Sequence, residues 1–384
     1  MAQITRVVIA GAGYAGVRVA SRLRSLLGES GEITVADRDA SHQLIVRLPE
    51  IIGGTISPDQ ALIPYSRLFG NDVRLVQSEI VKLLPEGAAL ETAEGEYTGD
   101  FLVVALGSAP DYHEVPGAQE HAFPVRSVRD AERLRRRLEQ VTGTGETVHV
   151  VIVGAGYTGT EVAGEIAEWG KRLQAEGGGG ITVTVVAPET RLLVEADLRL
   201  GDAAERILRQ KGVWFRLGTS VRRVEQAAIE LDPEPSCPAD VVVWAARARA
   251  APPVLSGAET VGHEGRIQVD PYLRSRRYDR VYLAGDVACA FDYVQDRVVA
   301  PSAQMAVREG NLVAENIAAE VRGRQVREFR PRRPGEALSL GGSGGVAEIG
   351  GVILTGRKAL ALKHAALARY LYQLGATGLL REYW

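Results

Sequence analysis

Two glycine-rich stretches are the residues best suited to hold a charged ligand: GAGYAG at 11–16, the first glycine loop, and GAGYTG at 154–159, the second. In such a loop the first glycine permits a tight turn and the second lets backbone N–H groups approach a diphosphate. The third lets helix and strand pack closely. The ligand's negative charge would lie at a helix N-terminus, where unpaired N–H groups and the helix dipole favour it. Each loop therefore predicts a dinucleotide site.

The residues around the first glycine loop complete a strand–helix–strand pattern. A β-branched apolar run at 6–10 precedes the loop, helical spacing covers 17–27, and a second strand is predicted at 33–36. Asp37 follows, about 20 residues beyond the loop, where a carboxylate accepts a ribose hydroxyl. A lone glycine motif is weak evidence, but a motif in this context is specific for a dinucleotide.

The second glycine loop has the same surroundings, so the chain contains an internal repeat. Strands are predicted at 148–153 and 181–186, with a helix between them. Two further apolar strands end at Gly107 and at Gly285-Asp286. Ligands of a doubly wound sheet bind beyond the carboxyl ends of its strands, so these residues are binding candidates as well. We predict an α/β fold with two Rossmann-like dinucleotide-binding domains.

Composition narrows the class of protein. The 384 residues carry a net charge of −3, which gives no reason to expect nucleic acid as a partner. The two cysteines, Cys237 and Cys289, form no CxxC pair, so we expect a reducing compartment and no redox-active disulfide. The six histidines lack ligand spacing, and we predict no metal. We also expect no signal peptide, and no apolar run approaches the ~20 residues of a membrane span.

Four segments carry a family resemblance: GAGYAG with Asp37, GAGYTGTE at 154–161, YLAGDVA at 282–288 and PSAQMAVREG at 301–310. With them the chain resembles the two-dinucleotide-binding flavoproteins. Within these it is most similar to the type II NADH dehydrogenases, single-subunit NADH:quinone oxidoreductases of bacterial membranes. The resemblance implies FAD in the first domain and NADH or NADPH in the second. It also implies hydride transfer to the flavin, electron transfer to a quinone, and no proton pumping.

The same resemblance implies a domain division. Residues 1–112 and 266–335 would form the FAD-binding domain, with the NAD(P)H-binding domain, residues 113–265, inserted between them. Residues 336–384 would form a short C-terminal β-hairpin followed by an amphipathic helix.

Site residues follow by position. The resemblance places the diphosphate and adenosine of FAD at the first glycine loop and Asp37, a ribityl or diphosphate-side hydroxyl at Asp286, and the pyrimidine end of the flavin at Ala303 and Gln304. The nicotinamide dinucleotide would lie beside the second glycine loop and Glu161. The full set of expected cofactor-binding residues is Gly11, Gly13, Tyr14, Ala15, Gly16, Asp37, Arg38, Arg47, Val81, Ala105, Gly107, Gly285, Asp286, Ala303, Gln304, Gly154, Gly156, Tyr157, Gly159 and Glu161.

Two of these residues are also the expected catalytic ones. Reduction of a quinone consumes protons as well as electrons, and Glu161, near a helix start, is the candidate relay. Gln304 would contact the flavin at the start of the predicted helix 301–321, whose dipole can stabilise charge on the ring. The alternatives are a first-turn acid that complements the helix dipole for Glu161 and an ordinary helix cap for Gln304. Tyr14 and Tyr157 have packing as their alternative role.

The C-terminal segment changes character. The predicted helix 357–374 carries leucines near one stripe and only positive charges, from Arg357, Lys358, Lys363 and Arg369. This pattern favours a helix lying on an anionic lipid surface, so we expect a cytoplasmic protein attached to the inner face of the cell membrane. The alternative is a helix packed on the body or across a homodimer interface, which its many alanines would suit.

Two departures from the family pattern leave open whether the nicotinamide cofactor is NADH or NADPH. Ala187 stands where an acid is expected to bind the adenosine ribose, and Arg247 stands where related sequences place a glycine. Both motivate alternatives: a soluble NAD(P)H-dependent reductase of another acceptor, or a flavin-binding sensor with impaired nicotinamide binding. Sulfide:quinone oxidoreduction shares the fold but needs catalytic cysteines.

Overall fold

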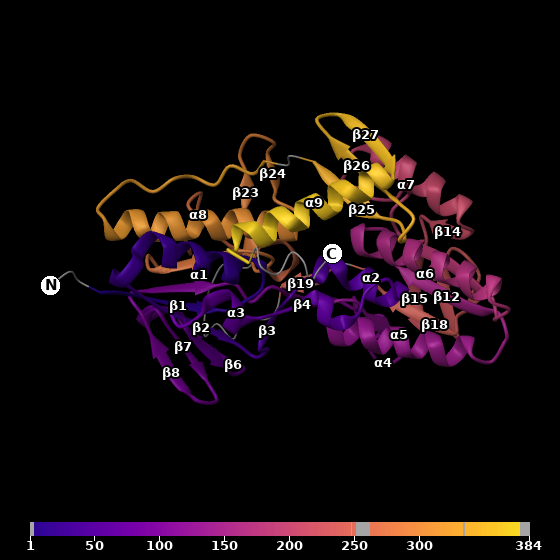
Figure 1. The fold of residues 1–384 in the computed structure, drawn as a ribbon, viewed down its shortest axis with the longest axis horizontal. Helices are drawn as coiled ribbons and strands as arrows, with labels where there is room; N and C mark the ends of the chain where they lie inside the picture. The colour runs from indigo at the N-terminus through magenta and orange to yellow at the C-terminus, as the bar shows by residue number, and fades with distance from the viewer. Residues whose placement is uncertain (1–3, 247, 251–261, 333–334, 377–384) are drawn as a thin grey trace.

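Two parallel five-stranded sheets form the two halves of the molecule (Figure 1). The computed structural model describes residues 4–246, 248–250, 262–332 and 335–376. The first sheet has the order β21-β9-β1-β2-β5 and the second the order β11-β18-β12-β13-β14. The first contains β1 (Thr5–Ala10), β2 (Gly31–Asp37), β5 (Arg74–Gln77), β9 (Phe101–Val104) and β21 (Val281–Leu283); the second contains β11 (Ala122–Pro124), β12 (Val148–Val153), β13 (Ile181–Ala187), β14 (Val213–Leu217) and β18 (Val241–Trp244).

Each half also carries a three-stranded antiparallel sheet at the same point of its topology. The sheet β6-β7-β8 precedes β9, and the sheet β15-β16-β17 precedes β18. This correspondence confirms the internal repeat and the predicted fold class. The bounds are β6 (Ile80–Leu84), β7 (Ala89–Thr92), β8 (Gly95–Thr98), β15 (Ser220–Val224), β16 (Ala228–Asp232) and β17 (Cys237–Pro238).

Strand β21 pairs with β9 in the first sheet, although every strand of the second sheet lies between them in the sequence. The first half is therefore completed by residues that follow the second half. This topology is what an insertion of one domain into the other requires, while the boundaries at 112, 265 and 335 stay a prediction.

Helices cover the sheets because their apolar faces pack on strands that are buried on both sides. In β1 the side chains of Val7, Val8 and Ile9 are all buried, as expected for a parallel strand between two helical layers. The helices are α1 (Tyr14–Leu27), α2 (Leu48–Gly53), α3 (Tyr65–Phe69), α4 (Ala118–His121), α5 (Val128–Thr142), α6 (Tyr157–Ala175), α7 (Leu198–Gln210) and α8 (Ala303–Val321). Short strands make up the remainder: β3 (Ser41–Gln43), β4 (Leu62–Pro64), β10 (Ser108–Pro110), β19 (Ala248–Ala250), β20 (Ile267–Gln268), β22 (Ala288–Cys289), β23 (Phe291–Asp292) and β24 (Arg297–Val298).

The C-terminal unit packs across both halves. It consists of β25 (Glu336–Ser339), β26 (Gly345–Ile349), β27 (Val352–Gly356) and α9 (Arg357–Gln373). Strands β26 and β27 form the hairpin, and β25 pairs with β26 to extend it into a three-stranded antiparallel sheet. In Figure 1 helix α9 (yellow) extends from this sheet toward α8 and α1. Among the described residues, no helix is both long and apolar enough to span a bilayer.

Candidate functional site

The first glycine loop leaves the start of α1 open. Gly11 has a φ of +95°, and a Cβ on it would lie 2.5 Å from the Ala105 carbonyl oxygen. A Cβ on Gly16 would overlap with the Gly11 carbonyl oxygen, so these two positions demand glycine. A Cβ on Gly13, in contrast, would meet nothing within 4 Å, and no side chain caps the helix. The start of this helix is therefore uncapped and open at Gly13, as the approach of a diphosphate requires.

The second glycine loop repeats this geometry. Gly154 has a φ of +113° and lies against the Ala245 carbonyl oxygen, 2.6 Å from where its Cβ would be. Gly159 is pressed against Gly154, whereas Gly156 again faces open space. Helix α6 also begins without a capping side chain. The second half thus has its own open helix start for a diphosphate.

Asp37, the last residue of β2, lies directly beside the first loop. Its Oδ2 accepts the Ala12 N–H at 2.6 Å and its Oδ1 accepts the Asp39 N–H at 2.9 Å. Burial raises the pKa of Asp37, and these two N–H groups oppose that rise. Ala187 ends β13 at the corresponding place and is fully buried. The second half therefore has no carboxylate at the position that corresponds to Asp37.

The carboxyl ends of β9 and β21 meet beside the same loop. Gly107 has a φ of +72° with open space around it, and the Ser108 hydroxyl donates to Asp286 Oδ2 at 2.6 Å. A Cβ on Gly285 would lie 3.3 Å from the Ala15 Cβ. The structure thus brings these predicted residues together around one open helix start.

Helix α8 begins next to them. Ser302 caps it by accepting the Met305 N–H at 3.2 Å; in the following turn Ala303 is half-buried and Gln304 is exposed. Glu309, which the sequence analysis did not select, is only 3% exposed and accepts the Gly285 N–H at 2.6 Å. Burial raises the pKa of Glu309 to about 8, with Asp286 adding to the rise and the Gly285 N–H and Arg266 opposing it. The sequence signal that could have identified Glu309 is its position as an acid on the apolar face of the helix.

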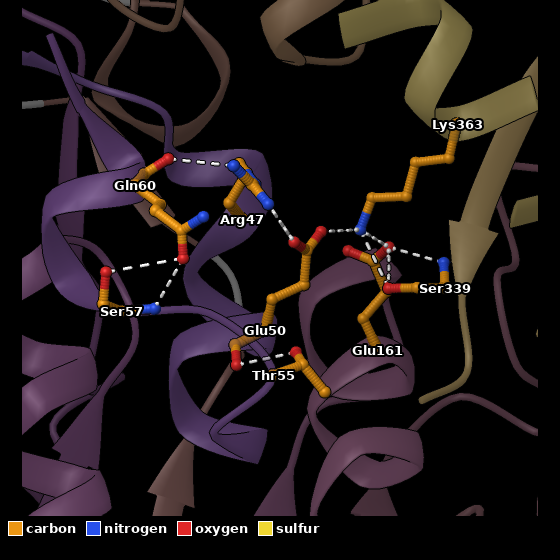
Figure 2. A network of polar contacts seen from close by, with 8 residues as sticks. All are labelled: Arg47, Glu50, Thr55, Ser57, Gln60, Glu161, Ser339 and Lys363. Atoms are coloured by element: carbon orange, nitrogen blue, oxygen red, sulfur yellow. Dashed lines mark hydrogen bonds and ion pairs between the residues drawn. The ribbon is translucent and has the colours of Figure 1, made fainter. Parts of the chain in front are cut away.

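Glu161 belongs to a buried group of charges that joins α2, α6, β25 and α9, which are far apart in the chain (Figure 2). Its Oε1 accepts from Lys363 Nζ at 2.8 Å and from the Ser339 N–H at 2.9 Å. Lys363 Nζ also lies 3.4 Å from Glu50 Oε1, and Glu50 pairs with Arg47 at 2.9 Å. We call Arg47, Glu50, Glu161, Ser339 and Lys363 the ion cluster. It ties α2 and α6 to the C-terminal unit.

This contact corrects one expectation about the C-terminal helix. Lys363 does not face lipid, because its side chain is only 10% exposed and is bound to two carboxylates. Burial by itself would lower the pKa of Lys363, but Glu161 and Glu50 raise it above its usual value. Ala359, Tyr370 and Leu371 are buried as well, so this face of α9 packs on the body.

Residues 5–310 match the family described as pyridine nucleotide-disulphide oxidoreductases. The chain belongs to this family. The membership confirms an oxidoreductase, and with it the expected FAD and nicotinamide cofactors.

Individual relatives agree with this membership. The oxidoreductase is 28% identical over 390 residues to a protein named type II NADH:quinone oxidoreductase from Staphylococcus aureus, covering 97% of each chain. The fold superposes on NDH2 from Plasmodium falciparum in complex with NADH with a TM-score of 0.84, at 14% identity, covering 99% of this chain and 98% of that one. A sulfide:quinone oxidoreductase from Aquifex aeolicus is similar too, with a TM-score of 0.81 at 16% identity. The match covers 98% of this chain and 92% of that one.

Several predicted binding residues of this oxidoreductase have protein partners. Tyr14 is buried, with its ring 4.9 Å from both the His42 and the Tyr370 rings. Besides Glu50, Arg47 binds the Gln60 carbonyl oxygen at 2.9 Å. Their assignment to the cofactor stays a prediction.

The other predicted residues differ in how far they are exposed. Arg38 is exposed after β2, Tyr157 is partly exposed at the start of α6, and Val81 lies at an irregularity of the β6–β7 pairing. Ala105 is buried, with its N–H bound to Ala10. Arg247 lies outside the described residues.

The described residues offer neither a paired cysteine nor a group of metal ligands. Cys237 and Cys289 are both unpaired and half-buried. Within the described ranges, no three His, Cys, Asp or Glu side chains gather as metal ligands. The oxidoreductase thus belongs to a disulphide-named family without a cysteine pair of its own.

Proposed function

We propose that this oxidoreductase oxidises NADH at a bound FAD and passes two electrons to a membrane-dissolved quinone, without proton pumping. The observation that carries the proposal is the pair of equivalent open glycine loops in a chain without a cysteine pair. The match to the type II NADH:quinone oxidoreductase of Staphylococcus aureus over 97% of both chains supports quinone as the acceptor.

Each half would hold one dinucleotide. Gly13 and its neighbours would receive the FAD diphosphate at the start of α1, with Asp37 and Asp286 binding hydroxyl groups. The start of α8, with Ala303 and Gln304, would stabilise negative charge at the pyrimidine end of the ring. The remaining residues for FAD are Gly11, Ala15, Gly16, Ala105, Gly107 and Gly285; those for NADH are Gly154, Gly156 and Gly159. When bound, FAD accepts a hydride from NADH and returns two electrons.

Glu161 would deliver a proton to the quinone. Its carboxylate is held by Lys363 and Ser339, contacts that orient it and allow a proton to pass among neighbouring polar groups. The Lys363 ammonium lies 2.8 Å from Glu161 Oε1 and would attract the negative charge left on Glu161 after each proton has passed.

The first test measures the flavin absorbance of the purified protein. Purified protein should carry flavin absorbance, which NADH bleaches without oxygen and a soluble quinone then restores. Because Ala187 supplies no ribose-binding carboxylate, NADPH should compete better than in a protein with an acid there, and both nicotinamides should be compared. A flavin that neither nicotinamide reduces would contradict the proposal and favour a sensor. A flavin that only a non-quinone acceptor reoxidises would favour a soluble reductase.

We further propose attachment to the inner face of the cell membrane through the C-terminal unit, rather than a homodimer across α9. Arg357, Lys358 and Arg369 remain exposed, and so do Val352 (56%) and Tyr372 (70%). Each cation near an anionic surface contributes about 1 kcal/mol. The protein should sediment with vesicles of anionic lipid and be released by high salt, while neutral vesicles bind it poorly. Dimerisation without vesicle binding would overturn the assignment.

A further inference from the structure

Glu165 is a buried acid that the proposed mechanism does not yet use. It lies on α6 one turn beyond Glu161 and is 1% exposed. Its Oε2 has no hydrogen-bond partner among the described residues. A Cβ on Gly53, at the end of α2, would lie 2.3 Å from this oxygen. The glycine therefore leaves room for a carboxyl oxygen that has no hydrogen-bond partner among the described residues.

The charges around Glu165 are already paired with one another. Lys363 contacts Glu161 and Glu50, and Glu50 also pairs with Arg47. Glu168, the next acid on α6, binds Lys211 and Ser343. Arg172, on the same helix as Glu165, donates to the Gly53 carbonyl oxygen at 2.7 Å, and no cation among the described residues hydrogen-bonds to Glu165 Oε2. Burial accordingly raises the pKa of Glu165 to about 8; Lys363 opposes the rise, and Glu50, Glu161 and Glu168 add to it.

The ion cluster is already balanced in charge without Glu165, which lies beside it. Arg47 and Lys363 balance Glu50 and Glu161, whereas an ionised Glu165 would leave one uncompensated buried charge. Glu161 Oε1 accepts hydrogen bonds from the Lys363 ammonium and from the Ser339 N–H. Glu165 lies one helical turn beyond it on α6, where side chains four residues apart are neighbours.

We propose that Glu165 is the proton reserve from which Glu161 is recharged during quinone reduction, an inference that rests on the proposed function. NADH supplies two electrons and one proton, and the quinone takes up two electrons and two protons. The second proton leaves the Glu165 O–H bond, forms an O–H bond on Glu161 and passes to a quinone oxygen. A proton from the medium then restores Glu165. Glu165 acts through Glu161 and touches no substrate.

Glu165→Gln tests this, because the amide keeps the shape but cannot ionise. We expect NADH to bleach the flavin of this variant at the wild-type rate within about twofold. Its kcat with a soluble quinone should fall about tenfold or more, and the decline of kcat above pH ~8 should disappear. Glu165→Asp should restore part of the rate together with a pH-dependent decline. Glu168→Gln, the matched change at a paired acid of the same helix, should leave kcat within about twofold.

Thermal unfolding supplies a readout that does not depend on activity. A raised carboxyl pKa means that the folded state binds more protons than the unfolded state between the two pKa values, so stability falls as pH rises toward 8. Between pH 6 and 9, the wild type should lose more Tm than Glu165→Gln. Equal slopes, or a kcat and pH profile matching the wild type, would overturn the inference. So would a parallel loss of both half-reactions. A wild type that cannot reduce a quinone would refute the proposed function instead, while the unfolding comparison still reports the ionisation of Glu165.

Discussion

Replacing Gly156 by valine should leave FAD bound and strongly weaken its reduction by NADH. The Gly156 φ of −78° is accessible to valine, and the space that a Cβ would enter is empty of protein atoms, so the fold should tolerate the change. The same space is where a diphosphate must approach the start of α6. We expect the NADH concentration for half-maximal bleaching to rise at least about 100-fold, equivalent to about 2.7 kcal/mol.

Gly13→Val is the matched control in the other half. Its surroundings are equally open, with a φ of −70°, but it faces the first dinucleotide site. This variant should fold and purify without flavin. Stopped-flow bleaching and the flavin-to-protein absorbance ratio check the two results together. A Gly156→Val variant that loses flavin, or one that NADH still bleaches normally, would contradict the assignment of the two halves.

Lys363→Met should destabilise the protein by about 3–5 kcal/mol, since it leaves the buried Glu161 and Glu50 carboxylates without their shared cation. Denaturant unfolding of the FAD-loaded protein measures this. Lys358→Met is the control on the same helix: Lys358 is exposed, so its change should stay within about 0.5 kcal/mol.

Adding Glu161→Gln to Lys363→Met should recover part of the loss, because one buried charge is then removed together with its partner. A loss at Lys363 no larger than that at Lys358 would show that the ion cluster adds nothing to stability.

The glycine loops were predictable because their chemistry is local. Gly11 and Gly16 are required by contacts inside one strand–turn–helix unit. The same spacing at Gly154 and Gly159 made the internal repeat recognisable in the sequence. The strand that precedes Asp286 was also predictable from the sequence, as an apolar run that ends in an acid.

The charge pairing was not predictable in the same way. Lys363 and Glu161 are 202 residues apart, and helical spacing says nothing about which acid faces a lysine across the fold. Lys363 therefore looked like a lipid-facing cation together with Arg357 and Arg369. Glu165 was hidden for a similar reason: its burial depends on Gly53, which lies on a different helix in the other half.

The split first sheet also dictates an order of assembly. The second sheet is built from one continuous stretch, 122–244, and can fold as soon as it leaves the ribosome. The Ser108–Asp286 bond, by contrast, closes over 178 intervening residues. The first sheet gains β21 only after the residues of the second sheet have been synthesised, so we expect the Ser108–Asp286 side of the proposed flavin site to form after the second half has folded.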